Sequence, residues 1–203
     1  VDGPALVAAL GTTPDQLNRV LERLKVDLGN RLPFDPAKLP AIRAYYREQA
    51  TDELAAVTES AEQVCHHVFD LLGSGPVSLG DPIDWHRDVK SGYRWDPTVY
   101  FADIPHGQGN GVDIKVPWEL SRGHHLVLLS QAALLTGGEK YARECTAPMT
   151  AWMKANPPGY GVNWACPMDV AIRAVNWIWA LALLVDRPEV TTRWFSEVIA
   201  SLV

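Results

Sequence analysis

The sequence predicts an all-α fold, an incomplete α/α toroid in which antiparallel helix pairs form an inner and an outer ring. Two segments, 117–136 and 167–185, are apolar on nearly every helical face, which is typical of helices buried on most sides. Each is followed, after a short link, by a segment that is apolar on one face only, at 139–155 and 188–203. Alternating inner and outer helices with short links are what a double ring of helix pairs requires.

The first part of the chain is expected to form a helical segment at 1–72, separate from the toroid portion at 73–203. Apolar residues recur at helical spacing through 17–28. A second, longer helical period runs through 41–72, and Gly73 follows as a helix-ending residue. These features predict helices that precede the toroid.

Helical periodicity disappears near 73–117, where Gly, Pro and Asp accumulate. A connection of this length without helices is usually either functional or disordered. Aromatic residues favour burial and therefore argue against disorder. The stretch contains Trp85, Tyr93, Trp95, Tyr100 and Phe101. We interpret it as a long irregular but ordered excursion, containing a short hairpin and packed over one end of the helices.

Within the predicted toroid, proline and glycine mark the helix ends. Gly137 closes the first inner helix, and Pro148 is expected to kink or divide the outer helix at 139–155. The run NPPGYG at 156–161 is a strong stop signal. The last helix keeps its period up to the final residue without a cap, so we expect the toroid to continue beyond it.

The few polar side chains of the segment 167–185 lie on one line. Asp169, Arg173 and Asn176 are spaced i, i+4, i+7, which places them on one helical face. Burying them is unfavourable unless they pair with one another or face a wet cavity. We therefore expect a salt bridge between Asp169 and Arg173. The polar stripe is expected either to connect neighbouring helices in the interior or to form the wall of a cleft. Asn163 and Trp164 lie in the loop just before this helix. We expect them at the mouth of the toroid, which is lined by the loops leading into the inner helices and is the default binding site.

Composition narrows the class of partner. The net charge of −6 argues against nucleic acid, whose phosphates need a basic face. The three cysteines are an odd number, so no disulfide framework is expected and at most one bridge is possible. Their spacing is not that of a metal site, and no cofactor is predicted. No stretch appears long and apolar enough to cross a membrane, because charged and amide residues interrupt 170–185.

Two stretches also resemble a known family. They are KVPWELSRGHHLVLLSQAALLTGGEKYA at 115–142 and NPPGYGVNWACPMDVAIRAVNWIWALAL at 156–183. Both are similar to the N-terminal α/α-toroid domain of the heparinase II/III-like polysaccharide lyases, of the alginate or heparin lyase type. The segment LLGSGPVSLGDPIDWHRDVKSGYRWD at 71–96 is similar to the long excursion that precedes the toroid in that family.

The resemblance implies a bacterial enzyme that cleaves acidic polysaccharides, such as heparan-type glycosaminoglycans or alginate, by β-elimination. An Asn or His neutralises the uronate carboxylate, a Tyr or His removes the C5 proton, and a Tyr protonates the leaving oxygen. That division of labour is needed because the C5 proton is a very weak acid until the developing charge is stabilised. The resemblance places these groups in later toroid helices and in a C-terminal β-sandwich domain.

By the same resemblance no catalytic residue falls within this chain, and the missing C-terminal part of the same protein is an expected partner. The candidate substrate-binding residues are Trp118, Arg122, His125, Asn163, Trp164, Arg173 and Asn176. Glu119 and Asp169 are expected to form structural ion pairs with Arg122 and Arg173. The alternatives stay open: the arginines could serve only those pairs, and His125 could be a hydrogen-bonded interior residue.

Three functions follow from this. The first is the N-terminal toroid portion of a polysaccharide lyase, periplasmic or secreted, which is inactive as this chain alone. The second is a non-catalytic toroid that binds or guides an exopolysaccharide during assembly or export. The third is a helical interaction scaffold without a glycan site. Because fold alone does not fix activity, the enzymatic hypothesis depends on the resemblance.

Overall fold

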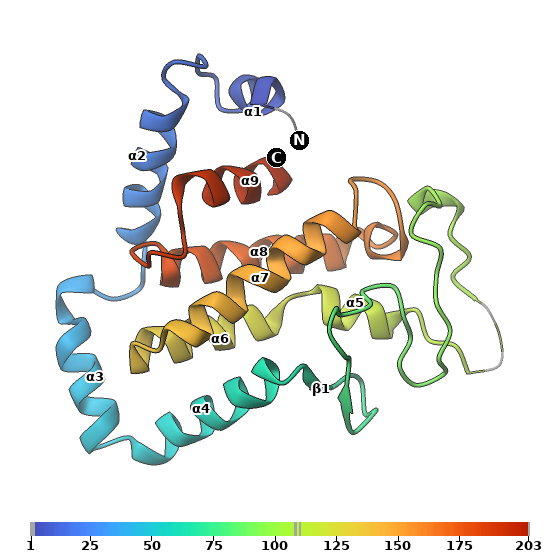
Figure 1. The fold of residues 1–203 in the computed structure, drawn as a ribbon, viewed down its shortest axis with the longest axis horizontal. Coiled ribbons are helices and arrows are strands. Elements are labelled where there is room, and N and C mark those ends of the chain that lie inside the picture. The colour runs from blue at the N-terminus through green and yellow to red at the C-terminus, as the bar shows by residue number, and fades with distance from the viewer. Residues whose placement is uncertain (1–2, 108, 110, 203) are drawn as a thin grey trace.

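The structure, a computed structural model, describes residues 3–107, 109 and 111–202 (Figure 1). Helices α6, α7 and α8 pack side by side, while α2, α3 and α4 follow one another around them, and α1 lies next to α9. The α-helices are α1 (Gly3–Ala9), α2 (Leu17–Gly29), α3 (Leu39–Glu48), α4 (Thr51–Cys65), α5 (Lys115–Ser121), α6 (His124–Thr136), α7 (Glu139–Ala155), α8 (Pro167–Leu184) and α9 (Thr192–Leu202). The shorter elements are the 3-10 helices η1 (Pro36–Lys38), η2 (Phe101–Asp103) and η3 (Val162–Trp164) and the strands β1 (Val68–Asp70) and β2 (Pro76–Ser78). The all-α prediction is confirmed, while closure into a toroid stays a prediction.

The long helix expected at 41–72 is two helices and a strand. The chain leaves helical geometry at Ala50, between α3 and α4, where φ is −127° and ψ is +48°. It leaves it again at His67, whose φ of +51° is left-handed and cannot continue a helix. Strand β1 follows and pairs with β2 in an antiparallel register, with Phe69 opposite Val77. The hairpin therefore lies earlier in the sequence than predicted.

In the second half of the chain, the helix breaks do not fall where the sequence predicted them. Gly123 adopts a φ of +76°, and a Cβ there would lie 3.1 Å from Leu126 Cδ1, so the segment expected as one helix is α5 followed by α6. Pro148, by contrast, is buried inside α7 and neither divides nor ends that helix. The final helix starts at Thr192 rather than at Pro188.

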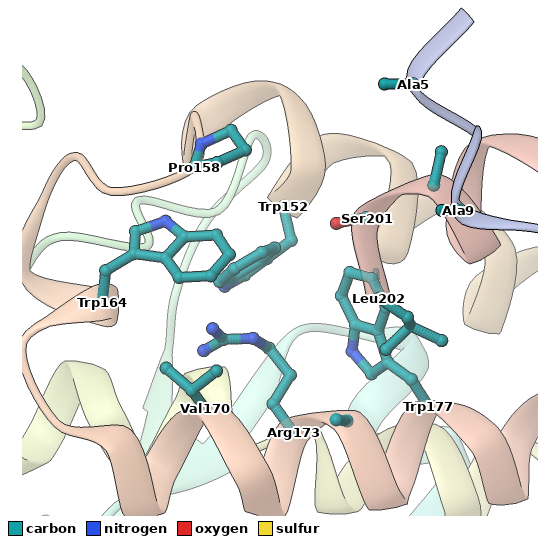
Figure 2. Close-up of a pocket in the computed structure, with 12 residues that line it drawn as sticks. Ala5, Ala9, Trp152, Pro158, Trp164, Val170, Arg173, Trp177, Ser201 and Leu202 are labelled. Carbon is teal, nitrogen blue, oxygen red and sulfur yellow. The ribbon is translucent and has the colours of Figure 1, made fainter. Parts of the chain in front are cut away.

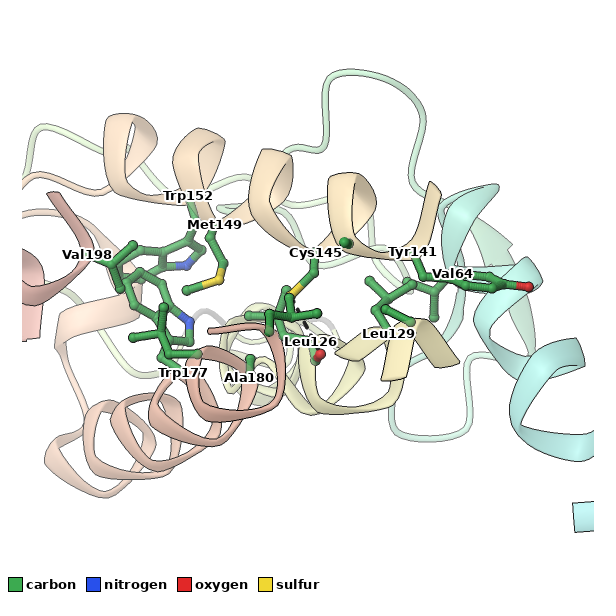
Figure 3. Close-up of a cluster of buried hydrophobic side chains, with 14 of the residues drawn as sticks. Val64, Leu126, Leu129, Tyr141, Cys145, Met149, Trp152, Trp177, Ala180 and Val198 are labelled. Carbon is green, nitrogen blue, oxygen red and sulfur yellow. Dashed lines mark hydrogen bonds between the residues drawn. The ribbon is translucent and has the colours of Figure 1, made fainter. Parts of the chain in front are cut away.

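The core lies between α4, α6, α7, α8 and α9, each of which contributes buried apolar side chains (Figure 3). Cys145 and Leu129 are fully buried at the centre, where α7 lies over α6. Leu21 of α2 belongs to the same core, and a smaller cluster around Trp95 and Trp118 lies under the excursion. The proposed division of the chain at residue 72 remains a prediction.

The described part of the excursion packs against the helices, as its aromatic residues predicted. Trp85 and Trp95 are each only 3% exposed, whereas Tyr93 and Tyr100 remain at the surface. Asp88 is fully buried and organises the loop, because its carboxylate accepts hydrogen bonds from Ser91 and from the backbone N–H groups of Lys90 and Asp113.

One expectation about α8 needs correction. Over its 18 residues the mean hydropathy is 1.3, so the helix is long and apolar enough to cross a membrane by length and composition. Within the protein, 39% of that window is buried. A core helix of a soluble protein has the same length and composition, so this feature by itself assigns no membrane span.

Acid is expected to destabilise the fold through His125. Burial is the main cause that lowers the pKa of this imidazole from 6.5 to about 4, and its ring packs edge-on against Phe69 with 5.2 Å between ring centroids. The unfolded chain therefore binds the proton first as pH falls, and the stabilising contribution, complete above pH 6.5, is lost on the way to pH 4. We expect a loss of up to about 3 kcal/mol.

Urea denaturation of the wild type and the His125→Gln variant at several pH values measures this contribution. The variant should lose much of the pH dependence between pH 4 and 7, leaving the share of His86, whose pKa is also lowered by burial. His66→Gln, at an exposed position, is the control and should keep the wild-type profile. Parallel profiles for wild type and His125→Gln would contradict the assignment.

Candidate binding pocket

A pocket of about 440 Å³ lies where the loop before α8 meets α8 and the terminal helices α1 and α9 (Figure 2). Three indole rings and one guanidinium group form its inner part. The lining residues are Ala5, Ala9, Trp152, Pro158, Trp164, Val170, Arg173, Ala174, Trp177, Ala200, Ser201 and Leu202. Except for Arg173 and Ser201, these side chains are apolar or aromatic.

Among the described residues of this lining, Arg173 is the only charged one, and it is 4% exposed. Its guanidinium carbon lies 4.0 Å from the ring centroid of Trp152 and 5.0 Å from that of Trp164, so both rings make cation–π contacts with it. Nη1 donates a hydrogen bond to the carbonyl oxygen of Asn163 at 3.2 Å. Nη2 is buried and has no hydrogen-bond partner among the described residues.

Burial lowers the pKa of Arg173 from its ordinary value to about 10, and the charge of Asp169 opposes that shift. The side chain therefore stays protonated at neutral pH. The pocket thus holds a positive charge at neutral pH, and the N–H groups of Nη2 have no partner among the described residues. In an apolar setting such donors favour an anionic acceptor.

The predicted Asp169–Arg173 salt bridge is wrong. Asp169 instead accepts from Nε of Arg122 at 2.5 Å, and Arg122 also pairs with Glu119. The reason is tertiary: Asp169 lies in the first turn of α8, which places its carboxylate next to the residue that ends α5. Asn176, which belongs to the same polar stripe of α8, donates from Nδ2 to the backbone carbonyl oxygen of Arg122 at 2.9 Å. These groups tie α5 to α8 and do not line the pocket.

Asn163 is also placed differently from the prediction, since it is 1% exposed and is not among the residues that line the pocket. Its Nδ2 donates to the carbonyl oxygen of Trp85 at 2.9 Å and to Oδ1 of Asn156 at 2.8 Å. Its own carbonyl oxygen holds Arg173. Asn163 therefore lies behind the lining of the pocket. Its hydrogen bonds connect Trp85 of the excursion, Asn156 of the loop and Arg173 of α8.

The backbone of this loop is equally constrained. Gly161 has a φ of +83°, and a Cβ at this position would lie 2.8 Å from Cε1 of His86. His86 is buried and donates from Nε2 to the carbonyl oxygen of Ala155 at 3.0 Å. The excursion thus holds both ends of the loop that carries Trp164.

The remaining predicted contacts lie elsewhere. The Nε1–H of Trp118, which is buried, donates to the carbonyl oxygen of Val162 at 2.8 Å. His125 packs on Phe69, and Asn176 lines a second, mainly apolar groove of about 830 Å³ between α3, α4, α6 and α8. Of the seven predicted contacts, the structure brings only Trp164 and Arg173 into the described pocket.

Sequence reasoning missed Trp152 and Trp177. Trp177 follows Arg173 at i+4, and this spacing could have indicated that both reach the same side of α8. Trp152 comes from α7, a different helix, and its position over Arg173 depends on how α7 crosses α8, which no local pattern records.

The pocket can hold an anion but lacks a group to remove a proton. Within the described part of the chain, its lining contains no His, Tyr, Asp, Glu, Cys or Lys. A protonated guanidinium is a donor only and cannot act as a general base. The arrangement therefore supports binding rather than bond cleavage.

Comparison with known proteins gives one match. A family model described as Heparinase II/III N-terminus matches residues 36–203. No curated protein and no solved structure matches the chain.

Proposed function

The chain belongs to the heparinase II/III N-terminal family, and we propose that it holds the acidic polysaccharide for a lyase that cleaves uronate-containing polymers by β-elimination. Membership makes it a polysaccharide-lyase-related domain with an all-α fold. The proposal adds the charge of the ligand and the place where it binds, which is the pocket around Arg173.

The observation that carries this proposal is the state of the Arg173 guanidinium. It is buried between two indole rings, has no carboxylate within ion-pair distance among the described residues, and keeps Nη2 unpaired. A buried cation without an ionic partner is unfavourable for the fold by itself. A bound carboxylate would supply the missing partner, and Trp164 would offer its apolar face to a sugar ring.

The chain alone is proposed to bind without cleaving, because the described lining of its pocket contains no general base. We propose that the catalytic groups come from another part of the parent protein. That part would also cover α8, where Met168, Val175 and Ile178 are 59%, 54% and 46% exposed. A helix apolar on nearly all faces is usually covered on all of them. We propose a periplasmic or secreted location for such a protein.

Calorimetric titration with acidic oligosaccharides, alongside an absorbance assay for unsaturated uronate, tests this function. We expect saturable binding without turnover, weakened about 10-fold or more by Trp164→Ala because a stacking ring is lost. Trp194→Ala is the matched control, since this indole donates to Thr150 outside the pocket and should leave affinity unchanged. Absence of binding, or turnover by this chain, would contradict the proposal.

A non-catalytic toroid that binds or guides an exopolysaccharide is the second candidate. The same lack of a base in the pocket favours it, and it predicts identical binding by this chain. The two functions separate in the full-length protein, where the assay for unsaturated uronate is expected to be positive only for the lyase.

A further inference from the structure

We propose that the pocket is a subsite for one unsulfated uronate ring, so that it selects a carboxylated sugar and excludes a sulfated one. This inference rests on the proposed binding of acidic polysaccharide and narrows its ligand. It follows from the number of charges, the number of free donors and the nature of the walls.

The charge count sets the first limit. Arg173 contributes a single positive charge, and no second Arg, Lys or His belongs to the described lining. One carboxylate is therefore compensated. A sulfated ring would bring further anionic groups into the same space, and each would be desolvated against indole and aliphatic walls without a counter-charge.

The donors set the second limit. Nη1 of Arg173 donates one hydrogen bond to the carbonyl oxygen of Asn163, and Nη2 is buried without a partner. The N–H groups that remain all belong to this one planar guanidinium. The hydroxyl of Ser201, which faces the pocket, is the other polar group of the described lining. One guanidinium and one hydroxyl suit a carboxylate next to a ring hydroxyl, whereas several sulfate groups around a ring need donors at several places.

The walls and the volume complete the description. Trp164 is partly exposed and offers the accessible aromatic surface, whereas Trp152 and Trp177 are 3% and 2% exposed and pack around the guanidinium (Figure 2). Aromatic faces stack on the C–H faces of pyranose rings. A space of about 440 Å³ is near the small end of ligand pockets, which run from about 300 to 1,000 Å³, so it suits one or two sugar rings rather than a long chain segment.

The test changes the charge of the pocket without touching Arg173. Ser201→Asp places a carboxylate in the lining, and this carboxylate would compete with the anionic sugar for the guanidinium. Ser201→Asn is the control, because asparagine has nearly the same size as aspartate and no charge. Affinities are measured by calorimetry for the wild type and both variants, with an unsulfated oligouronate, a heparin oligosaccharide of equal length and a neutral hexose oligomer.

We expect the oligouronate to bind with one site per chain and to lose 10- to 100-fold in affinity in Ser201→Asp but less than threefold in Ser201→Asn. The heparin and neutral oligomers should bind at least 10-fold more weakly to the wild type. If heparin binds more tightly and Ser201→Asp weakens it, the pocket binds acidic polysaccharide but the carboxylate selection is wrong. If the three oligomers all fail to bind, the proposed function fails as well, and equal affinity for the neutral oligomer overturns the role of the charge.

Discussion

Replacing Arg173 by methionine is expected to abolish binding of the acidic oligosaccharide while leaving the free energy of unfolding unchanged or about 1 kcal/mol higher. The pKa of Arg173, which burial lowers to about 10, corresponds to roughly 3 kcal/mol of unfavourable burial for the charged form. Against this, the fold loses two cation–π contacts and one hydrogen bond, together about 2 kcal/mol. Methionine fills a similar volume without a charge to bury.

Arg122→Met provides the matched control, because Arg122 makes ion pairs with both Glu119 and Asp169. Removing it leaves the carboxylate of Asp169, 1% exposed, without its cation, and we expect a loss of about 2–4 kcal/mol. Urea denaturation and calorimetry of the two variants therefore give opposite patterns. A loss of more than 2 kcal/mol in Arg173→Met would show that this arginine is mainly structural.

Asn163→Ala is expected to lower the free energy of unfolding by about 2–4 kcal/mol and to weaken ligand binding. The change removes the donor of two buried hydrogen bonds and leaves the carbonyl oxygen of Trp85 and Oδ1 of Asn156 unpaired. Each buried acceptor that is left without a donor lowers the free energy of unfolding by about 1–3 kcal/mol. Because the same loop carries Trp164 and accepts from Arg173, the pocket should lose its geometry as well.

Asn176→Ala is the control for this effect. Its Nδ2 also donates to a backbone carbonyl oxygen, that of Arg122, but the group is only partly buried. We expect a loss of about 1 kcal/mol and unchanged affinity. If Asn163→Ala unfolds at the same urea concentration as the wild type, the buried network does not position the loop.

Periodicity predicted where the helices of the second half lie, and α7 begins and ends at the predicted residues, 139 and 155. It missed the break at Gly123, which needs a left-handed φ, and the start of the last helix at Thr192. The breaks at Ala50 and His67 could not, because apolar residues keep a helical period across both. Spacing within one helix predicted a partner for Asp169 on that same helix. The actual partner, Arg122, comes from α5, and only the packing of α5 on α8 brings the two together.

The pocket was predicted in part for the same reason. Arg173 and Trp164 were found because each stands out locally, one as a charge on an apolar helix and one in a polar loop. Whether a loop residue points inward or outward is not encoded in its identity, so Asn163 was predicted to contact sugar although it is buried. Trp152 joins the site through the crossing of α7 and α8.

The most direct test is an NMR titration of the chain, labelled with ¹⁵N in its tryptophan indoles, with an unsulfated oligouronate. The eight indole N–H groups report separately on the pocket and on the rest of the protein. We predict that the resonances of Trp152, Trp164 and Trp177 shift together along one saturable curve, while that of Trp194 stays fixed. Shifts confined to Trp179, which lines the second groove, or no saturable shift at all, would contradict the assignment of the pocket.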